Sequence, residues 1–215
     1  MRPLILVLIL TSSAHAGVDL PALIKAAPTC DPARAHCIGL KLHIAVGDQG
    51  AVASADWITM QLSRVNHHFA AIDTGFQITA VADLPASAVR IEDAKERHSL
   101  APRVGGTVID VFVTGQLDDI DIKGEIIYGV AWPAGNRKFI IISTMAWQNT
   151  LTHELGHVFG LPHSSYAVSL MNKTDRKEPP YDKRTFHEDE LASMRLQLKR
   201  LLRDKIIANL AAKKP

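Results

Sequence analysis

The sequence predicts an α+β fold in which strands alternate with helices along one domain. Apolar and polar residues alternate over residues 40–46, which is the period of a half-buried strand. Apolar residues recur at helical spacing over 58–72, and Gly75 is expected to end that helix. An unbroken apolar run at 139–143 is typical of a strand at the centre of a sheet.

The elements between these segments follow from the same two periodicities. His67 and His68, within the helix expected at 58–72, are interpreted as surface residues because no partner pattern accompanies them. The charged stretch at 87–100 predicts a solvated helix. Further strands are expected at 76–80, 107–114 and 125–132, with a turn at 133–136 before the central strand.

A last helix is predicted near the C-terminus. Thr185 and Glu188 have the spacing of a capping box, in which each side chain bonds to the other residue's backbone. The apolar face of this helix would consist of Leu191, Met194, Leu198 and Leu201. Its basic end is interpreted as a solvated face, because 24 Lys and Arg against 22 Asp and Glu leave a net charge of only +2. We therefore expect no nucleic-acid partner.

The first 16 residues have the pattern of a secretory signal peptide. Arg2 precedes an apolar run at 4–10, and Ala14-His15-Ala16 is a small-x-small cleavage site, after which the mature chain would begin near Gly17. The run is too short to cross a bilayer, so no membrane span is expected. The alternative is a buried N-terminal strand. The prediction is a secreted or periplasmic protein with an N-terminal segment at 17–39 and one domain at 40–215, expected to be a monomer.

Cys30 and Cys37 are the two cysteines of the chain. An even number in an exported protein favours a disulfide between them. The alternative is that Cys30 serves as a thiolate that blocks a metal site, which would make 17–39 a short propeptide rather than a disulfide loop. Asp31 is a weaker candidate for the same blocking role.

Three aspartates form an acidic loop at Asp118, Asp119 and Asp121 that is a weak candidate for calcium. The loop is not an EF-hand, because Lys123 and Val130 occupy positions where ligands belong. A solvated acidic loop is the favoured interpretation.

Residues 153–163 contain the strongest chemical pattern. His153 and His157 are four residues apart, so on a helix both rings face the same side and can hold one ion. Glu154 would lie beside this ion as a general base. Gly160 can end the helix in a left-handed conformation and return His163 to the ion as a third ligand. Three protein ligands leave one position open, as in catalytic zinc sites.

The complete pattern H-E-x-x-H-x-x-G-x-x-H resembles that of the metzincin zinc metallopeptidases. With Ser164 after the third histidine and Met171 as the expected Met-turn, it is closest in motif to the matrixin branch. The resemblance implies a mixed, mostly parallel twisted sheet with an antiparallel edge strand around 128–130, a zinc helix and a C-terminal helix. It departs from that branch in lacking Tyr-Pro after Met171, the propeptide switch and the histidine-rich loop of a second zinc.

The resemblance implies a secreted zinc endopeptidase acting on peptide or protein substrates. It would hydrolyse peptide bonds by a zinc-bound water with Glu154 as general base, and Met171 would underlie the single ion. Tyr166, Tyr181 and His187 are unranked candidates for stabilising the oxyanion. Two alternatives are an exported non-catalytic zinc protein that binds a partner through its edge strand, and a zinc amidohydrolase acting on a non-peptide substrate.

Overall fold

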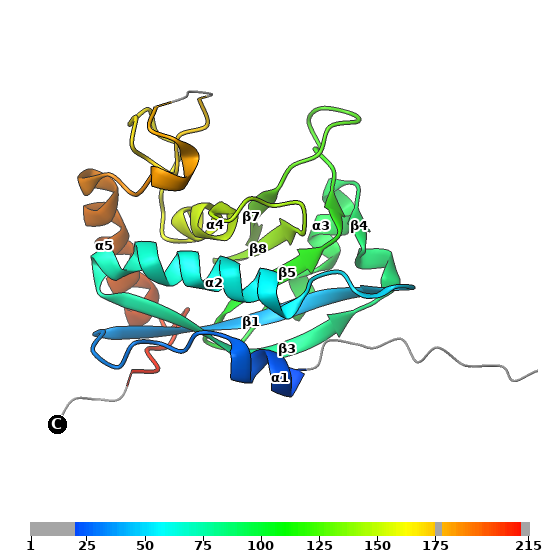
Figure 1. Ribbon diagram of the computed structural model, residues 1–215, viewed down its shortest axis with the longest axis horizontal. Coiled ribbons are helices and arrows are strands. Elements are labelled where there is room, and N and C mark those ends of the chain that lie inside the picture. Colours follow the sequence, from blue (N-terminus) through cyan, green and yellow to red (C-terminus); the bar gives the residue numbers. More distant parts are fainter. Residues whose placement is uncertain (1–19, 175–177, 212–215) are drawn as a thin grey trace, which may run out of the picture.

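A twisted sheet of six strands carries the fold, as the computed structural model of residues 20–174 and 178–211 shows (Figure 1). The predicted signal peptide and residues 17–19 lie outside the described residues. The sheet order is β3 (Thr74–Leu84), β1 (His36–Gly47), β5 (Ile109–Thr114), β8 (Arg137–Ser143) and β7 (Gly129–Ala134), and β2 (Gly50–Ala51) pairs with the end of β1. All neighbours among the first four are parallel, whereas β7 runs antiparallel to β8. The predicted sheet, with its antiparallel edge, is confirmed.

Helices and short ribbons complete the fold. The α-helices are α1 (Leu20–Ala26), α2 (Ala55–Phe69), α3 (Ala94–Ser99), α4 (Thr150–Val158) and α5 (Glu188–Arg203). Single 3₁₀ turns are η1 (Ala70–Ile72), η2 (Ala86–Ala88), η3 (Ala101–Arg103) and η4 (Tyr181–Lys183). The strands β4 (Arg90–Ile91) and β6 (Gln116–Leu117) form a separate parallel pair. No helix among the described residues is long and apolar enough to cross a membrane.

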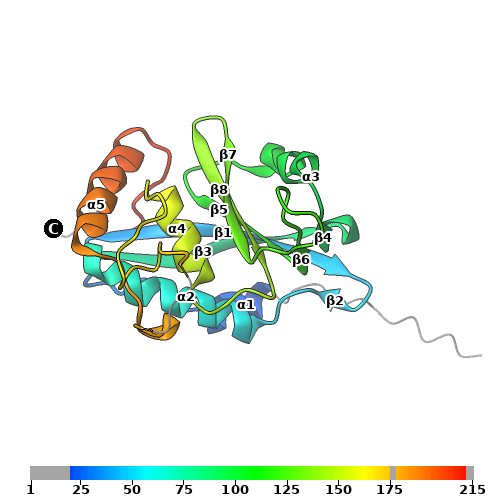
Figure 2. The ribbon, with the colours of Figure 1, turned by 90° about the horizontal axis from the view of Figure 1, so that it is seen from above.

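Alternation along the strands gives the sheet two buried faces. Leu40, Leu42 and Ile44 of β1 point toward α2 and α4, where a cluster of aromatic rings centres on Phe69. Ala45 points to the other face, together with alternate residues of β5 and β8 and the region around α3. Figure 2 shows α2 and α4 side by side along one side of the sheet, with α5 across one end. The long strands are therefore buried on both sides, as expected for parallel sheets.

Three local expectations are wrong, each because another interaction takes precedence. The helix at 55–72 ends at Asp73, which adopts a left-handed conformation (φ 55°), and Gly75 already belongs to β3. The stretch 87–100 contains β4 before the short helix α3 begins. The last helix begins two residues later than predicted: His187 is its N-cap, and His187 and Glu190 form the capping box. Thr185 instead pairs with Ser169 in an isolated bridge.

The disulfide between Cys30 and Cys37 is present, with the sulfur atoms 2.02 Å apart. It closes the loop that enters β1, and Cys30 packs against Gly75 of β3. Helix α1 contacts α2 and β3, its Leu23 joins the same buried cluster as α2 and α4, and Figure 2 shows it next to α2. Because Cys30 is bonded to Cys37, the alternative of a blocking thiolate finds no support in this arrangement.

Replacing both cysteines with serine should lower the free energy of unfolding by about 2–3 kcal/mol, because the cross-link removes conformations from the unfolded chain. Urea unfolding of the oxidised protein and the Cys30→Ser, Cys37→Ser double variant measures the difference. Rapid alkylation of both thiols in native protein without a reductant would contradict the bond itself.

His68 lies on the buried face of α2, with only 4% of its surface exposed, so the expectation of a surface residue is wrong for it. His67 is exposed, as expected. Burial lowers the pKa of His68 from 6.5 to about 4. Between these values the unfolded chain binds a proton that the folded protein excludes. The stabilising effect is therefore complete above pH 6.5 and is lost as the pH falls toward 4.

His68→Gln should remove this part of the pH dependence, because glutamine does not titrate. Thermal unfolding at pH 7.0 and pH 5.0 should show a smaller drop in Tm for the variant than for the wild type. His67→Gln serves as the exposed control and should keep the wild-type drop. Equal drops in all three proteins would show that His68 does not exclude its proton.

Candidate metal centre

Three histidine rings converge at the end of α4. His153 and His157 come from successive turns of the helix, and His163 follows it in the chain. Their ligand atoms all lie within 4.8 Å of one another, and Nε2 of His157 is 3.1 Å from Nε2 of His163. Tetrahedral ligands at about 2.0–2.1 Å from zinc are about 3.3 Å apart. The rings therefore fit a single zinc ion, and among residues 20–174 and 178–211 no second such group of His, Cys, Asp or Glu occurs.

Backbone carbonyls orient two of these rings. Nδ1 of His153 lies 2.7 Å from the carbonyl oxygen of Leu170, and Nδ1 of His157 lies 2.7 Å from that of Leu161. Each Nδ1 therefore donates its proton to a carbonyl, and Nε2 keeps a lone pair for a metal. Burial lowers the pKa of His153 and of His163 to about 4, and also lowers that of His157. The neutral rings are the form that binds metals.

A sharp turn after α4 returns the third histidine to the other two. Gly160 adopts φ +86°, where a glycine costs little, and the N–H of Leu161 bonds to the carbonyl of Gly156 at 2.9 Å. The next residue after His163 is held in place as well, since the N–H of Ser164 donates to the carbonyl of Met171 at 3.1 Å. The predicted role of Gly160 as the helix end agrees with this geometry.

Met171 lies fully buried under α4. A Cβ atom at Gly156 would be only 2.6 Å from its sulfur, so the glycine is what allows the loop to approach the helix. The carbonyl of the preceding residue, Leu170, is the one that holds His153. Met171 thus packs against α4 at Gly156, next to the residue whose carbonyl orients His153, and is not among the group of ligand atoms.

Glu154 faces the edge strand β7. It is only 5% exposed, and the N–H of Ala131 donates a hydrogen bond to its carboxylate. A Cβ atom at Gly129 would lie 2.9 Å from Cγ of Glu154, so β7 can come this close only with a glycine there. Burial raises the pKa of Glu154 to about 8, whereas Lys173 and Lys138 act in the opposite direction. Sequence reasoning missed Gly129, although a glycine inside a strand often marks such close approach.

The outer edge of β7 has a definite hydrogen-bonding pattern. The N–H of Ala131 points toward Glu154 and away from β8. Residues two positions apart in an antiparallel strand share a side, so Gly129 and Pro133 face outward too. Proline has no N–H, and the row of outward donors therefore ends before Pro133.

The three candidates for oxyanion stabilisation lie in two different places. The ring of Tyr166 stacks on His187 with centroids 3.7 Å apart, and its hydroxyl donates to Asp189 at 2.8 Å, so Tyr166 packs against the N-terminal end of α5, where His187 is the N-cap. Tyr181 instead is hydrogen-bonded to Thr150 on α4 and lies close enough to Glu154 for the carboxylate to raise its pKa, after burial as the larger cause. Of the three, Tyr181 is the one beside Glu154.

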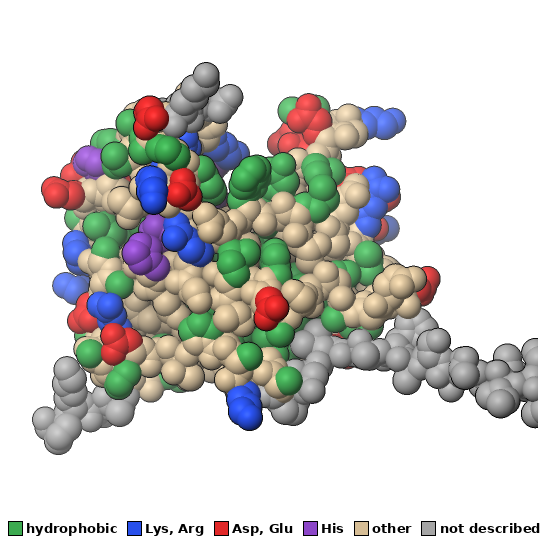
Figure 3. Space-filling model, viewed as in Figure 1, with side chains coloured by type: hydrophobic (Ala, Val, Ile, Leu, Met, Phe, Trp, Pro, Cys, Tyr) green, Lys and Arg blue, Asp and Glu red, His purple; other side chains and the backbone are tan. Residues whose placement is uncertain are grey.

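Hydrophobic side chains surround a hollow beyond β7. Figure 3 shows them on both sides of the hollow between the loop that leads to α5 and the loop after β6. Among the exposed ones, Tyr128 precedes β7, and Trp147 lies just before α4 with its ring 6.4 Å from that of Tyr181. This end of the molecule offers apolar contacts next to Glu154.

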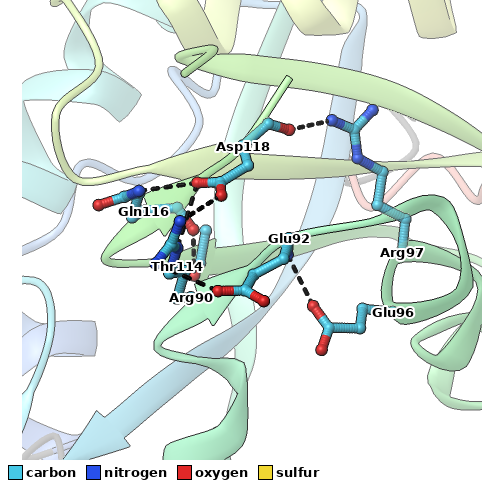
Figure 4. A network of polar contacts seen from close by, with 7 residues as sticks. All are labelled: Arg90, Glu92, Glu96, Arg97, Thr114, Gln116 and Asp118. Atoms are coloured by element: carbon cyan, nitrogen blue, oxygen red, sulfur yellow. Dashed lines mark hydrogen bonds and ion pairs between the residues drawn. The ribbon is translucent and has the colours of Figure 1, made fainter. Parts of the chain in front are cut away.

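The acidic loop is tied to the strands β4 and β6. Asp118 pairs with Arg90 and accepts a bond from Gln116, while its carbonyl accepts one from Arg97 (Figure 4). Asp119 accepts the N–H groups of Asp121 and Ile122. These carboxylates serve the loop's own structure, and calcium binding there stays the weaker of the two predicted alternatives.

Comparisons with known proteins agree with this arrangement. The model of the matrixin family, Peptidase_M10, matches residues 58–195. Among solved structures, archaemetzincin from Methanopyrus kandleri is similar with a TM-score of 0.54 and 18% identity, covering 78% of this chain and 98% of that one. Metalloproteinase-II from Bacteroides fragilis is similar with a TM-score of 0.52 and 15% identity, covering 81% of this chain and 60% of that one. A search of curated proteins found no significant match.

At these identities the two structures support the fold, whereas the family model spans most of the chain. It covers α2, the whole sheet from β3 onward, the three histidines and the first half of α5. The motif-based prediction of a metzincin is confirmed. The chain belongs to the matrixin family and is, by that membership, a zinc metallopeptidase.

Proposed function

We propose that the protein is an exported endopeptidase that hydrolyses peptide bonds within extended segments of protein substrates. One observation supports this most: the buried carboxylate of Glu154 lies between the histidine cluster and the open edge of β7. A base, a metal site and a strand edge that can pair with a peptide are thus adjacent. The three groups that peptide hydrolysis requires therefore lie together around Glu154.

Glu154 carries the proton transfers in this proposal. Zinc held by His153, His157 and His163 would act as a Lewis acid and lower the pKa of water toward about 7. The carboxylate takes a proton from the attacking water and then delivers it to the departing nitrogen. The N–H of Ala131 fixes its orientation, and Tyr181 is the candidate that would donate to the developing oxyanion.

The open edge of β7 would bind the substrate by adding a strand to the sheet. Gly129 and Ala131 face outward, and the N–H of Ala131 is held by Glu154. An extended peptide would therefore pair with the N–H and carbonyl of Gly129 and with the carbonyl of Ala131, whatever its side chains are. The hydrophobic side chains around the hollow next to Glu154 favour apolar residues on that side of the scissile bond. This binding mode requires an unfolded or flexible substrate segment.

Export is proposed on two grounds. The signal-like pattern at 1–16 lies outside the described residues, but the disulfide of Cys30 and Cys37 fits an oxidising compartment. In the proposed organisation, the N-terminal segment at 17–39 carries the disulfide and leads into the catalytic domain at 40–215. Residues 36–39 already belong to β1, so this segment would not be removed for activity. The monomeric state stays a prediction.

The non-catalytic alternative has a specific difficulty. A structural zinc is usually closed by four protein ligands, whereas three rings gather here and the nearest carboxylate is held apart by Ala131. The choice of substrate distinguishes an endopeptidase from an amidohydrolase that acts on small molecules. Digestion of unfolded casein, with sequencing of the product termini, would identify an endopeptidase. Hydrolysis of small amides without digestion of casein would identify the amidohydrolase.

His163→Ala should sharply weaken zinc binding while the fold persists, because His153 and His157 remain as an incomplete pair of ligands on α4. Zinc content after dialysis, measured by atomic absorption with circular dichroism on the same sample, checks this expectation. His67→Ala, at an exposed histidine of α2, is the matched control and should retain full zinc. Unchanged zinc in His163→Ala would remove the third ligand from the proposal.

Glu154→Ala should retain one zinc per chain but lose peptide cleavage by about 10²–10⁴-fold in kcat, since one carboxylate serves both proton transfers. KM should change much less, because the strand edge is intact. Glu188→Ala, at an exposed carboxylate of α5, is the control and should keep normal turnover. Cleavage near the wild-type rate by a zinc-loaded Glu154→Ala protein would overturn the proposed mechanism.

A further inference from the structure

A second recess adjoins the metal centre on the side away from Tyr181. We call it the hairpin cleft, because it lies between the turn of the β7–β8 hairpin, the end of α4 and the C-terminal part of α5. Its volume is about 250 Å³, and His157 and Gly160 line it on the α4 side. Figure 2 shows the hairpin projecting next to α5 with α4 between them. The cleft therefore borders the histidine cluster at His157.

The hairpin cleft has an apolar floor and a cationic rim. Val108, Val158, Leu201 and Ile207 contribute to the floor, and Arg137 and Lys138 of β8 stand at the rim. Its lining residues include no Asp or Glu, and within the described chain neither cation forms a salt bridge. Both bind neutral carbonyls instead: Arg137 that of Gly106, and Lys138 that of His157 at 3.1 Å. Two cations without a carboxylate make this recess complementary to an acidic group.

The end of the open strand edge lies at the same place. Pro133 lines the cleft and is the outward residue of β7 that has no N–H to offer. A substrate paired with the free backbone groups of Gly129 and Ala131 finds no backbone donor at Pro133, whose carbonyl alone faces outward, so side-chain contacts add to recognition there. Pro133 is two residues from Ala131, about 7 Å along a strand.

We propose that the hairpin cleft is a specificity site for an acidic side chain of the substrate, two or three residues before the scissile bond. The position assumes that the peptide runs antiparallel to β7, the geometry in which strand pairing is more stable. The aliphatic part of a glutamate lies on the apolar floor, and its carboxylate meets Lys138 and Arg137. This inference rests on the proposed endopeptidase activity and adds a substrate preference to it.

The test uses a peptide whose cleavage site has been mapped, made with Glu or Gln at each of the three positions before the scissile bond. At low salt, kcat/KM of the wild type should be about 3- to 10-fold higher for Glu at the second or third position. The preference should fall below about 2-fold in 1 M NaCl, because salt screens the two charges at the rim. Equal rates for Glu and Gln at low salt would overturn the site, and so would a preference that salt leaves unchanged.

Charge-removing variants assign the preference to the cleft. The ratio of Glu to Gln rates should approach one in Arg137→Gln, Lys138→Gln, and should fall partly in Lys138→Gln alone, with zinc content measured for each. Lys199→Gln is the matched control, because Lys199 is an exposed lysine of α5 outside the cleft. Its ratio should equal that of the wild type. A wild-type ratio in the double variant would place the acid preference elsewhere.

A binding measurement separates failure of the site from failure of the activity. Zinc-loaded Glu154→Ala protein should bind a fluorescein-labelled Glu peptide about 3- to 10-fold more tightly than its Gln counterpart, measured by anisotropy. If that ratio is found but the wild-type protein cleaves no peptide, the acidic specificity of the cleft is supported and the proposed endopeptidase activity is wrong. If the wild type cleaves peptides but the Glu154→Ala protein binds the two peptides equally, the endopeptidase activity is supported and the specificity site is wrong.

Discussion

The close contact between α4 and the loop that carries Met171 is the interaction on which the metal centre depends. It exists because Gly156 has no side chain, which leaves the methionine sulfur against the helix. From that contact the carbonyl of Leu170 reaches His153, and the carbonyl of Met171 holds Ser164 next to the third histidine. A methyl group at position 156 would displace the loop, and with it the orientation of one ring and the position of another. The ligand geometry therefore depends on a packing contact that involves no metal ligand.

The burial of Glu154 likewise depends on a glycine that allows two elements to approach closely. Gly129 lets β7 approach until the carboxylate is almost covered, and Ala131 supplies the hydrogen bond that keeps it oriented. A carboxylate held in this way has its pKa raised by burial, while two lysines at the opposite ends of the site oppose that change. The charge balance therefore includes Lys138 and Lys173, which no ligand motif contains.

The parts that could be predicted from the sequence are those that depend on local periodicity or on fixed spacing. The central strands, the helix at 55–69 and the three histidines follow from patterns in which each residue's role depends on near neighbours. The misplaced boundaries show the limit. Gly75 suggested the end of a helix, but Asp73 could adopt the left-handed conformation, and Gly75 was needed against Cys30 in β3.

Long-range contacts account for the rest. His68 has no partner pattern in the sequence, and only the packing of α2 on the segment around Phe186 shows that it is buried. Gly129 and Glu154 are 25 positions apart, and their contact exists only when the edge strand lies over α4. The hairpin cleft likewise combines residues of β8, α4 and α5, which no local pattern relates.

The proline in β7 also bears on how the molecule behaves toward its own copies. An exposed strand edge invites pairing between identical chains, and such pairing leads to aggregates when the free row of backbone groups is long. Here the outward row offers the N–H of Gly129, while the N–H of Ala131 is held by Glu154 and Pro133 has none. One donor and the neighbouring carbonyls can anchor a short peptide, yet they provide little to extend the sheet into a neighbouring molecule. The edge of β7 can therefore stay accessible to substrate peptides, while copies of the enzyme do not pair with one another through it even at high concentration.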